Sequence, residues 1–283
     1  ANQAEKAHEY FAQALKQFPD GPLTTECRFG LGRSLELLGE TNSALQFFRY
    51  VASQKESPLR DDAQLQLAIL LYRQKQYESA AEASQQLLER YPGSELLAHA
   101  AYWLGMSQLA LGQWTDASAT FSEAAQSHPD HPLSAAIHFS AGEALRQSGN
   151  SKAATAFYEQ VTNKWPDSRW ADDSLQTLTQ MSLDAGQPTQ AAQWAEVFQE
   201  RYPDSPLAPT VKQMVGRAAL KQGQFDTAIA VFESLTEETP PTPVETPGQT
   251  TTEPATTAHL GDDPVTETVV SQKRNDSDPT NEY

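Results

Sequence analysis

Residues with catalytic or metal-binding chemistry are few in this chain, and their spacing does not complete a site. His8 and Glu9 open the pattern of a zinc-protease helix, but Ala12 stands where the second histidine ligand would fall. Residues 30–32 begin like a dinucleotide-binding loop, yet Leu35 occupies the position of the third glycine. Neither pattern therefore supports catalysis or cofactor binding.

Two histidines and two pairs of adjacent acids are the remaining candidates. His128 and His131 flank a Pro-Asp turn, and they would bind a metal only with further ligands that are not evident. The acidic pairs at 61–62 and 172–173 begin predicted helices, where carboxylates interact favourably with the helix dipole. No serine elbow or phosphate loop occurs. We predict a protein that is not an enzyme and that holds no cofactor and no metal.

The strongest pattern is a 37-residue period that glycine and proline share. It is formed by Gly112, Gly149, Gly186 and Gly223, and by Pro92, Pro129, Pro166, Pro203 and Pro240. Two independent markers with one period indicate a structural unit that is repeated in tandem. Function should therefore come from a surface that the repeated unit builds.

Residues 95–129 show the unit. Apolar residues recur at helical spacing from 95 to 111, and Gly112 then suits a left-handed helix stop. A second helical stretch runs from 114 to 128 and ends before Pro129. We call the first helix of each unit helix A and the second helix B.

The unit recurs along most of the chain. Helix A is predicted at 22–38, 58–74, 95–111, 131–147, 168–184 and 206–221, and helix B at 41–54, 77–91, 114–128, 151–164, 188–201 and 225–237. Residues 1–18 form one more helix B, so the array begins in mid-repeat and the chain is expected to be a piece of a longer protein. The predicted fold is all-α, a right-handed α-solenoid of tandem helix-turn-helix repeats.

The array is predicted to span residues 1–237. It divides into a half repeat, 1–21, and about six repeats, 22–57, 58–94, 95–130, 131–167, 168–204 and 205–240. Residues 238–283 are rich in Thr, Pro, Asp and Glu and poor in large apolar residues, so we predict a disordered tail or linker.

Small and aromatic residues alternate where the helices should cross. Gly105, Gly142 and Gly216 let helix A approach its own helix B to about 8–10 Å. The predicted core aromatics are Phe48, Phe121, Tyr158 and Phe232. Lys75 stands at a left-handed stop where other units have glycine, which carries a steric cost. Ser57, Ser94, Ser168 and Ser205 are predicted to cap the first turn of helix A.

The repeated residues resemble a known family. In the reference unit the matching residues are Leu104, Gly105, Gly112, Trp114, Ala117, Phe121, Ala124 and Pro129, in the order and spacing of the tetratricopeptide repeat. The unit of 37 residues is longer than the usual tetratricopeptide repeat of about 34 residues. This greater length and the Tyr-Pro-Asp/Gly-Ser joint resemble a subgroup of bacterial envelope proteins. That subgroup includes the Tol-Pal-associated coordinator of cell division and the outer-membrane assembly lipoprotein. The resemblance favours a periplasmic or envelope location, with a cytoplasmic one left open.

The composition limits the classes of partner that the protein is expected to bind. The formal charge is −17, from 37 acids against 20 bases, so a phosphate-binding groove and a nucleic-acid partner are not expected. No apolar run approaches the roughly 18 residues that would span a membrane, and Cys27 is the only cysteine. A protein or peptide partner is the remaining prediction.

The resemblance implies that helix A lines the concave side of the array and binds the partner there. Outward positions of helix A hold Arg33, Glu36, Tyr72, Arg73, Met106, Leu109, Glu143, Arg146, Gln147, Gln180, Arg217 and Lys221. A merely solvated polar face is the alternative. Members that clamp a terminal carboxylate use Lys and Asn at fixed concave positions, and this chain lacks that set.

Three functional hypotheses follow. The first is a non-catalytic scaffold whose concave helix-A surface binds a partner polypeptide, in a bacterial cell-envelope assembly. The second is an accessory segment of a larger enzyme or secretion or assembly machine. The third is self-association through the ends of the array, because an uncapped terminal helix leaves apolar surface exposed.

Overall fold

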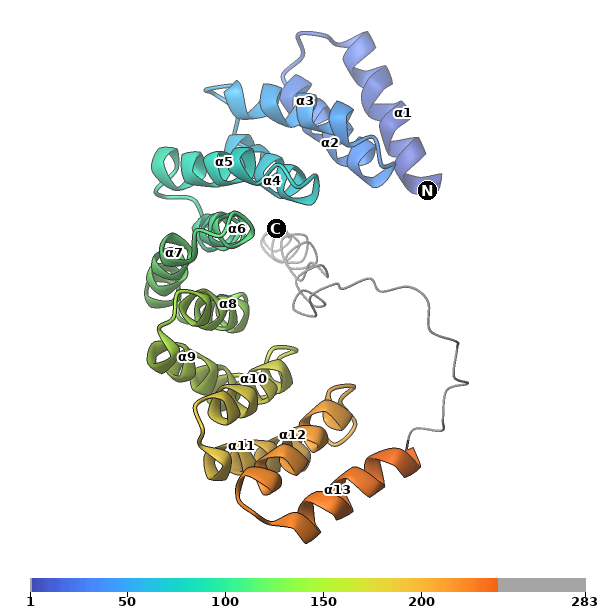
Figure 1. Ribbon diagram of the computed structural model, residues 1–283. Helices are drawn as coiled ribbons and strands as arrows, with labels where there is room; N and C mark the ends of the chain where they lie inside the picture. Colours follow the sequence, from blue (N-terminus) through green and yellow to red (C-terminus); the bar gives the residue numbers. More distant parts are fainter. Residues whose placement is uncertain (1, 239–283) are drawn as a thin grey trace, which may run out of the picture. The chain divides into compact units, whose positions relative to one another are not determined.

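The computed structural model describes residues 2–238, which form thirteen α-helices and no strand (Figure 1). The predicted tail lies outside these described residues apart from Glu238, which ends the last helix. The described part of the chain divides into two compact units between residues 154 and 155. All described regular structure is helical and tandem, which confirms the predicted all-α repeat class.

The first unit contains eight complete helices. They are α1 (Asn2–Gln17), α2 (Thr24–Leu37), α3 (Thr41–Ser53), α4 (Arg60–Arg73), α5 (Tyr77–Arg90), α6 (Leu97–Ala110), α7 (Trp114–Ser127) and α8 (Ser134–Gln147). Each helix packs on the next one along the chain. Helices α4, α6 and α8 lie in one layer and α5 and α7 in the other (Figure 1). The first layer consists of helices A and the second of helices B.

Helix α9 (Ser151–Lys164) contains the boundary between the units. The second unit continues with α10 (Ala171–Asp184), α11 (Pro188–Arg201), α12 (Ala208–Lys221) and α13 (Phe225–Glu238). In both units the observed helix ends lie within three residues of the predicted ones. Periodicity located the helices because each one repeats the same apolar face.

The turn between helix A and helix B requires a left-handed residue. Gly39, Gly112, Gly149, Gly186 and Gly223 all have positive φ there, between 70° and 83°. Lys75 adopts the same conformation with φ 59°, and it is the one described non-glycine residue that does so. The strained stop predicted at Lys75 is therefore present, and the turn geometry is kept without glycine.

Glycine on helix A makes room for the aromatic ring of its own helix B. A methyl group added at Gly105 would lie 2.5 Å from the ring of Phe121, and one added at Gly216 would lie 2.6 Å from Phe232. Both distances are well inside van der Waals contact, so an added methyl group would require each ring to shift. Phe121 is fully buried and Phe232 is half-buried.

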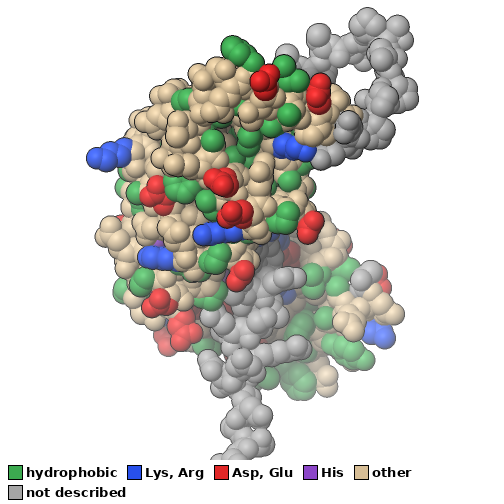
Figure 2. Space-filling view, turned by 90° about the horizontal axis from the view of Figure 1, so that it is seen from below, with side chains coloured by type: hydrophobic (Ala, Val, Ile, Leu, Met, Phe, Trp, Pro, Cys, Tyr) green, Lys and Arg blue, Asp and Glu red, His purple; other side chains and the backbone are tan. Residues whose placement is uncertain are grey.

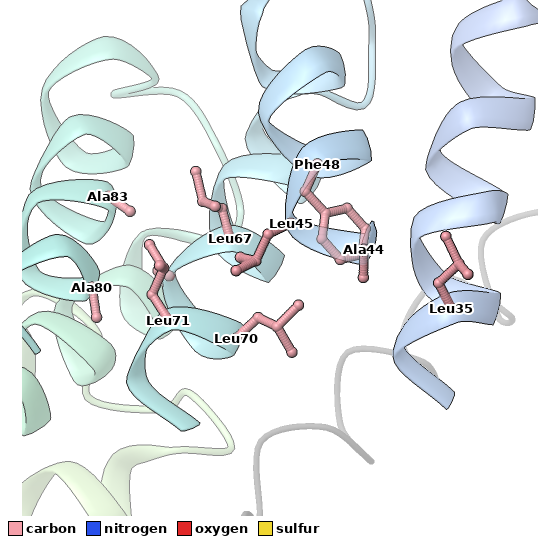
Figure 3. Packing of buried hydrophobic residues seen from close by; sticks show 10 residues of the cluster. Leu35, Ala44, Leu45, Phe48, Leu67, Leu70, Leu71, Ala80 and Ala83 are labelled. Atoms are coloured by element: carbon pink, nitrogen blue, oxygen red, sulfur yellow. The ribbon is translucent and has the colours of Figure 1, made fainter. Parts of the chain in front are cut away.

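One buried cluster shows how consecutive repeats share a core. Figure 3 shows Leu45 and Phe48 of α3 packed beside Leu67 and Leu70 of α4, with Ala80 of α5 beyond them. Leu45 is 4% exposed because the following helix A covers it. Each helix B in the interior of the array therefore hides its outer apolar face under the next helix A.

The serines that precede helix A do not cap its first turn, which corrects the prediction. Ser57, Ser94 and Ser205 accept from the N–H of Leu59, Leu96 and Leu207 at 3.1, 3.1 and 3.2 Å. The helices begin only at the third residue after each serine. The hydroxyls therefore close a separate turn before the helix, and the buried Ser168 Oγ has no partner in the described structure.

Two of these serines also join neighbouring repeats. Ser94 donates from Oγ to Asp61 Oδ2 at 2.6 Å, and Ser205 donates to Asp172 Oδ2 at 2.7 Å. Both acids begin helix A of the preceding repeat. These carboxylates therefore connect a helix start to the next joint, in addition to their favourable position in the helix dipole.

Candidate partner-binding surface

The predicted helix-A residues of the first unit form a charged cluster between α2 and α4. Arg33 donates from Nη1 to Glu36 Oε2 at 2.8 Å and to Gln66 Oε1 at 2.6 Å. Arg73 donates from Nη1 to Glu36 Oε1 at 2.9 Å. Glu36 is thus held between two guanidinium groups, with its side chain only 10% exposed. The cluster carries one net positive charge on a chain that is strongly negative.

An aromatic group adjoins this cluster on α4 and α6. Tyr72 contacts the ring of Tyr77 at 5.3 Å and the edge of Trp103 at 5.1 Å between ring centroids. Trp103 in turn contacts Tyr102 at 5.5 Å. Tyr72 was a predicted binding residue, and the structure places it half-buried within this aromatic contact network.

Met106 and Leu109 lie deeper than a contact residue on an open surface would. Met106 is 2% exposed, and its Sδ lies 3.9 Å from Ser140 Oγ on α8. Leu109 is 9% exposed. Their burial places the two apolar residues of the predicted set in the packing between helices.

The remaining predicted residues of the first unit lie on α8. Arg146 donates from Nη2 to Glu143 Oε2 at 2.9 Å and from Nε to Glu143 Oε1 at 3.3 Å. Both side chains are partly exposed. This two-point pair is one helical turn long, so it fixes both groups on the same face of α8. Gln147 follows them and is exposed.

In the second unit, three predicted residues are held by contacts between α10 and α12. Arg217 donates from Nη1 to Gln180 Oε1 at 3.2 Å. Lys221 donates from Nζ to the backbone carbonyl of Leu183 at 2.7 Å. Arg217 and Gln180 therefore meet across adjacent A helices, while Lys221 contacts the backbone of α10.

Every cation in the predicted set has an acceptor within its own unit. The cations are Arg33, Arg73, Arg146, Arg217 and Lys221. Exposed ion pairs typically contribute about 0–1 kcal/mol, and the exposed contact of Arg217 with the neutral Gln180 is weak in the same way, so a partner's carboxylate or carbonyl could replace it at little cost. Glu36 is only 10% exposed, so its pairs with Arg33 and Arg73 hold those two cations in place.

Sequence reasoning missed the polar atoms buried on α6. His99 is 1% exposed, and neither ring nitrogen has a hydrogen-bond partner in the described structure. The indole N–H of Trp103, one turn later, also lacks an acceptor. Burial, and secondarily the neighbouring His131, lowers the pKa of His99 from 6.5 to about 4. The sequence offered no signal for this, since a lone histidine on a helix is compatible with any exposure.

His128 and His131, the histidines considered as metal ligands, have a structural role at the joint before α8. The Leu133 N–H donates to His131 Nδ1 at 3.1 Å, so His131 occupies the place that Ser94 has one repeat earlier. Burial, and then His128, lowers the pKa of His131. Among residues 2–238 no group of three or more His, Cys, Asp or Glu side chains is arranged to hold a metal ion.

Surface charge is mixed in sign. On the face shown in Figure 2, carboxylates and cations are interspersed with apolar side chains rather than gathered by sign. None of the helices in the described part of the chain combines the length and the hydrophobicity needed to cross a bilayer.

Three family models match the sequence, each described as tetratricopeptide repeat. They match residues 1–58, 62–94 and 96–167, which together make up more than half of the chain. No curated protein matches the sequence. The matched residues include the joint serines, the turn glycines and the core aromatics of the first four repeats.

Solved structures resemble the chain in fold. PilW, described as a widely conserved type IV pilus biogenesis factor, is 17% identical, with 77% of this chain and 94% of PilW covered and a TM-score of 0.56. YrrB, a TPR protein with an unusual peptide-binding site, is 18% identical over 73% of this chain and 100% of YrrB, also at 0.56. A tetratricopeptide repeat protein from Parabacteroides merdae is 16% identical over 83% and 87%, at 0.56. At these identities the likeness concerns the fold alone.

Proposed function

Because the chain belongs to the tetratricopeptide repeat family, we propose that it is a non-catalytic scaffold whose helix-A surfaces bind a partner polypeptide. The observation that carries this proposal is the repeated helix-A layer, in which side chains from successive A helices converge. Arg33, Glu36 and Arg73 converge between α2 and α4, and Gln180 and Arg217 converge between α10 and α12. In each unit, side chains of two neighbouring A helices thus meet, which suits contact with an extended or helical segment.

The chemistry of these clusters favours a partner segment with acceptors. Guanidinium groups donate to carboxylates and carbonyls in a fixed geometry. The half-buried Tyr72, which packs on the buried Trp103, provides apolar surface next to Arg73 of the charged cluster. A polypeptide with alternating acidic and apolar residues would use both.

We further propose that the partner belongs to a cell-envelope assembly. The Tyr-Pro-Asp/Gly-Ser joints support this placement, as does the likeness in fold to PilW, a pilus biogenesis factor by its description. The second candidate is an accessory segment of a larger secretion or assembly machine. The same likeness favours it, and the two candidates share the helix-A surface as the site of contact.

Charge reversal on helix A tests the scaffold proposal in each unit separately. Arg146→Glu changes the first unit and Arg217→Glu the second, while Arg49→Glu makes the same change at an exposed position of α3, a helix B. The full chain is immobilised, and recovered partners are quantified after crosslinking. Each helix-A variant should lose partner recovery with an unchanged circular dichroism spectrum. Equal recovery by all three variants and the wild type would reject the helix-A surface.

A further inference from the structure

The last repeat leaves open a surface that the interior repeats cover. Ile229 of α13 is 54% exposed, whereas the residues at the same position of earlier repeats are either buried, as are Leu45 at 4% and Ser118 at 9%, or half-buried, as are Ala81, Thr155 and Ala192. Leu220 of α12 is 46% exposed, whereas Leu183, its counterpart on α10, is fully buried. The difference is positional, because in the interior the next helix A lies over these residues.

The core aromatic position of helix B shows the same difference in exposure, with Phe232 in the last repeat. Its counterparts Phe48, Phe121 and Tyr158 are fully buried, while Phe232 is half-buried. One side of its ring packs on Gly216, where an added methyl group would lie 2.6 Å away. The exposed part of the ring continues the apolar surface of Ile229. We call Leu220, Ile229 and Phe232 the end face.

The interior of the molecule shows which kind of element fits such a face. At the α3–α4 joint, Leu45 and Phe48 are covered by Leu67, Leu70 and Leu71 of α4. At the α11–α12 joint, Ala191 shares a cluster with Met214 and Ala218 of α12. The covering element is in each case a helix A. Helix α4 is buried on all sides by further repeats, whereas α12 buries Val211, Met214 and Ala218 on one face and keeps its Lys and Arg residues outside the core, so α12 shows the pattern that suits an end position.

The negative charge of α13 favours some helices over others as occupants of the end face. Helix α13 contains Asp226, Glu233 and two further acids in its last turn, and no Lys or Arg. The last Lys or Arg before α13 in the sequence, Lys221, donates to the carbonyl of Leu183. A second copy of α13 would bring like charges together. Residues 239–283 carry eight acids against two bases, so that segment also matches the face poorly in charge.

We propose that the end face binds an amphipathic helix with basic residues from a partner protein, which takes the position of a following helix A. Ile229 and Phe232 lie on a helix B, so most of this surface is separate from the helix-A clusters, while Leu220 has the helix-A position that Glu36 has in the first repeat. The apolar residues of the incoming helix would cover Ile229, Phe232 and Leu220. Its Lys or Arg residues would lie near Asp226 and Glu233, both of which are exposed.

The chain supplies matched probes for this proposal. A capped peptide of residues 207–222, the α12 sequence, has a net charge of +3, and its counterpart one repeat earlier, 170–185, has −3. Both are helix-A sequences of equal length, and they differ in sign of charge. Binding of each labelled peptide to the full chain is measured by fluorescence anisotropy at low and high salt. The +3 peptide should bind, more weakly as salt screens the charges, and the −3 peptide should not.

Two variants locate the binding. Ile229→Asp should reduce affinity for the +3 peptide by about tenfold or more, while Tyr10→Asp, at a 71% exposed position of α1, should leave it unchanged. Asp226→Lys combined with Glu233→Lys should exchange the preference toward the −3 peptide. Exposed positions are used, and circular dichroism checks that the fold is kept.

Several outcomes would overturn the proposal. These are no binding of the +3 peptide, equal binding of both peptides, or binding that Ile229→Asp does not change. Binding that appears only after removal of residues 239–283 would make that segment the occupant. A concentration-dependent dimer by light scattering that Ile229→Asp abolishes would make a second copy the occupant. Because helix-A charge reversal is tested separately, failure here leaves the scaffold proposal standing.

Discussion

The α3–α4 joint and the α12–α13 end of the array are built from the same repeat positions but have opposite exposure. Phe48 is enclosed between Gly32 on one side and the following helix A on the other. Phe232 has the matching glycine, Gly216, but no following helix among the described residues. The difference teaches that a repeat does not bury its own core. One side of its aromatic ring packs against its own unit, and the other side packs against the next unit.

Truncating the core aromatic at the two places should give the largest contrast. Phe121→Ala should lower the free energy of unfolding by about 3–5 kcal/mol, because a fully buried ring leaves a cavity. Phe232→Ala should lower it by about 1–2 kcal/mol, because the half-buried ring loses less contact. Urea denaturation followed by circular dichroism measures both. Equal losses would mean that the following helix A contributes nothing to burial of the ring.

Acid should destabilise the interior through His99. Its folded-state pKa is lowered from 6.5 to about 4, so between these values the unfolded chain takes up a proton that the folded chain refuses. The contribution of the neutral His99 to the free energy of unfolding is therefore fully present above pH 6.5. It is lost as the pH drops to 4, which lowers the free energy of unfolding by on the order of 3 kcal/mol. The urea midpoint of the His99→Leu variant should change less between pH 7.5 and 4.5 than that of the wild type. An unchanged acid dependence in this variant would contradict the burial of the neutral ring.

Adding a methyl group beside each ring should separate the two places again. Gly105→Ala should destabilise by about 1–3 kcal/mol, since the added carbon lies 2.5 Å from the enclosed ring of Phe121. Gly216→Ala makes a similar contact of 2.6 Å, but the ring of Phe232 has an open side to move toward. There the helix preference for alanine, about 1 kcal/mol, should offset most of the strain. The thermal midpoints of the two variants measure this difference. A larger decrease in the midpoint for Gly216→Ala than for Gly105→Ala would contradict the prediction.

Changes at the turns should have smaller effects than the core changes Phe121→Ala and Gly105→Ala. Lys75→Gly should stabilise by about 1 kcal/mol, because glycine relieves the left-handed strain at φ 59°. Gly112→Ala should destabilise by a similar amount at φ 73°. Both changes are read as shifts in the thermal midpoint. A stabilising Gly112→Ala would show that the turn can adopt another conformation.

The repeat positions of the fold could be predicted because they depend on short-range pattern. The helix ends, the turn glycines and the placement of Phe48 and Phe121 in the core follow from apolar spacing within one unit. The joint serines were predicted less well. Ser94 has the residue type of a helix cap, but its hydroxyl closes a turn and reaches Asp61 in the preceding repeat. Residue type alone does not distinguish these roles.

The candidate site could be predicted as a set of positions but not as a set of contacts. Arg33 and Gln66 are far apart in sequence, and only the fold, which places α2 near α4, brings Arg33 Nη1 and Gln66 Oε1 to 2.6 Å. Met106 occupies a helix-A position like Arg33, yet it is buried beside Ser140 of α8. Each outcome depends on which side chain the neighbouring helix presents.

The sequence by itself determined the repeat, its register and its local geometry, because these arise from spacings of three, four and 37 residues within the chain. Only the tertiary structure decided which equivalent positions are covered. Ile229 and Leu45 have the same place in the pattern, and one is exposed while the other is buried. Burial is a property of the neighbouring element, and a periodic sequence assigns the same residue type whether or not that neighbour is present.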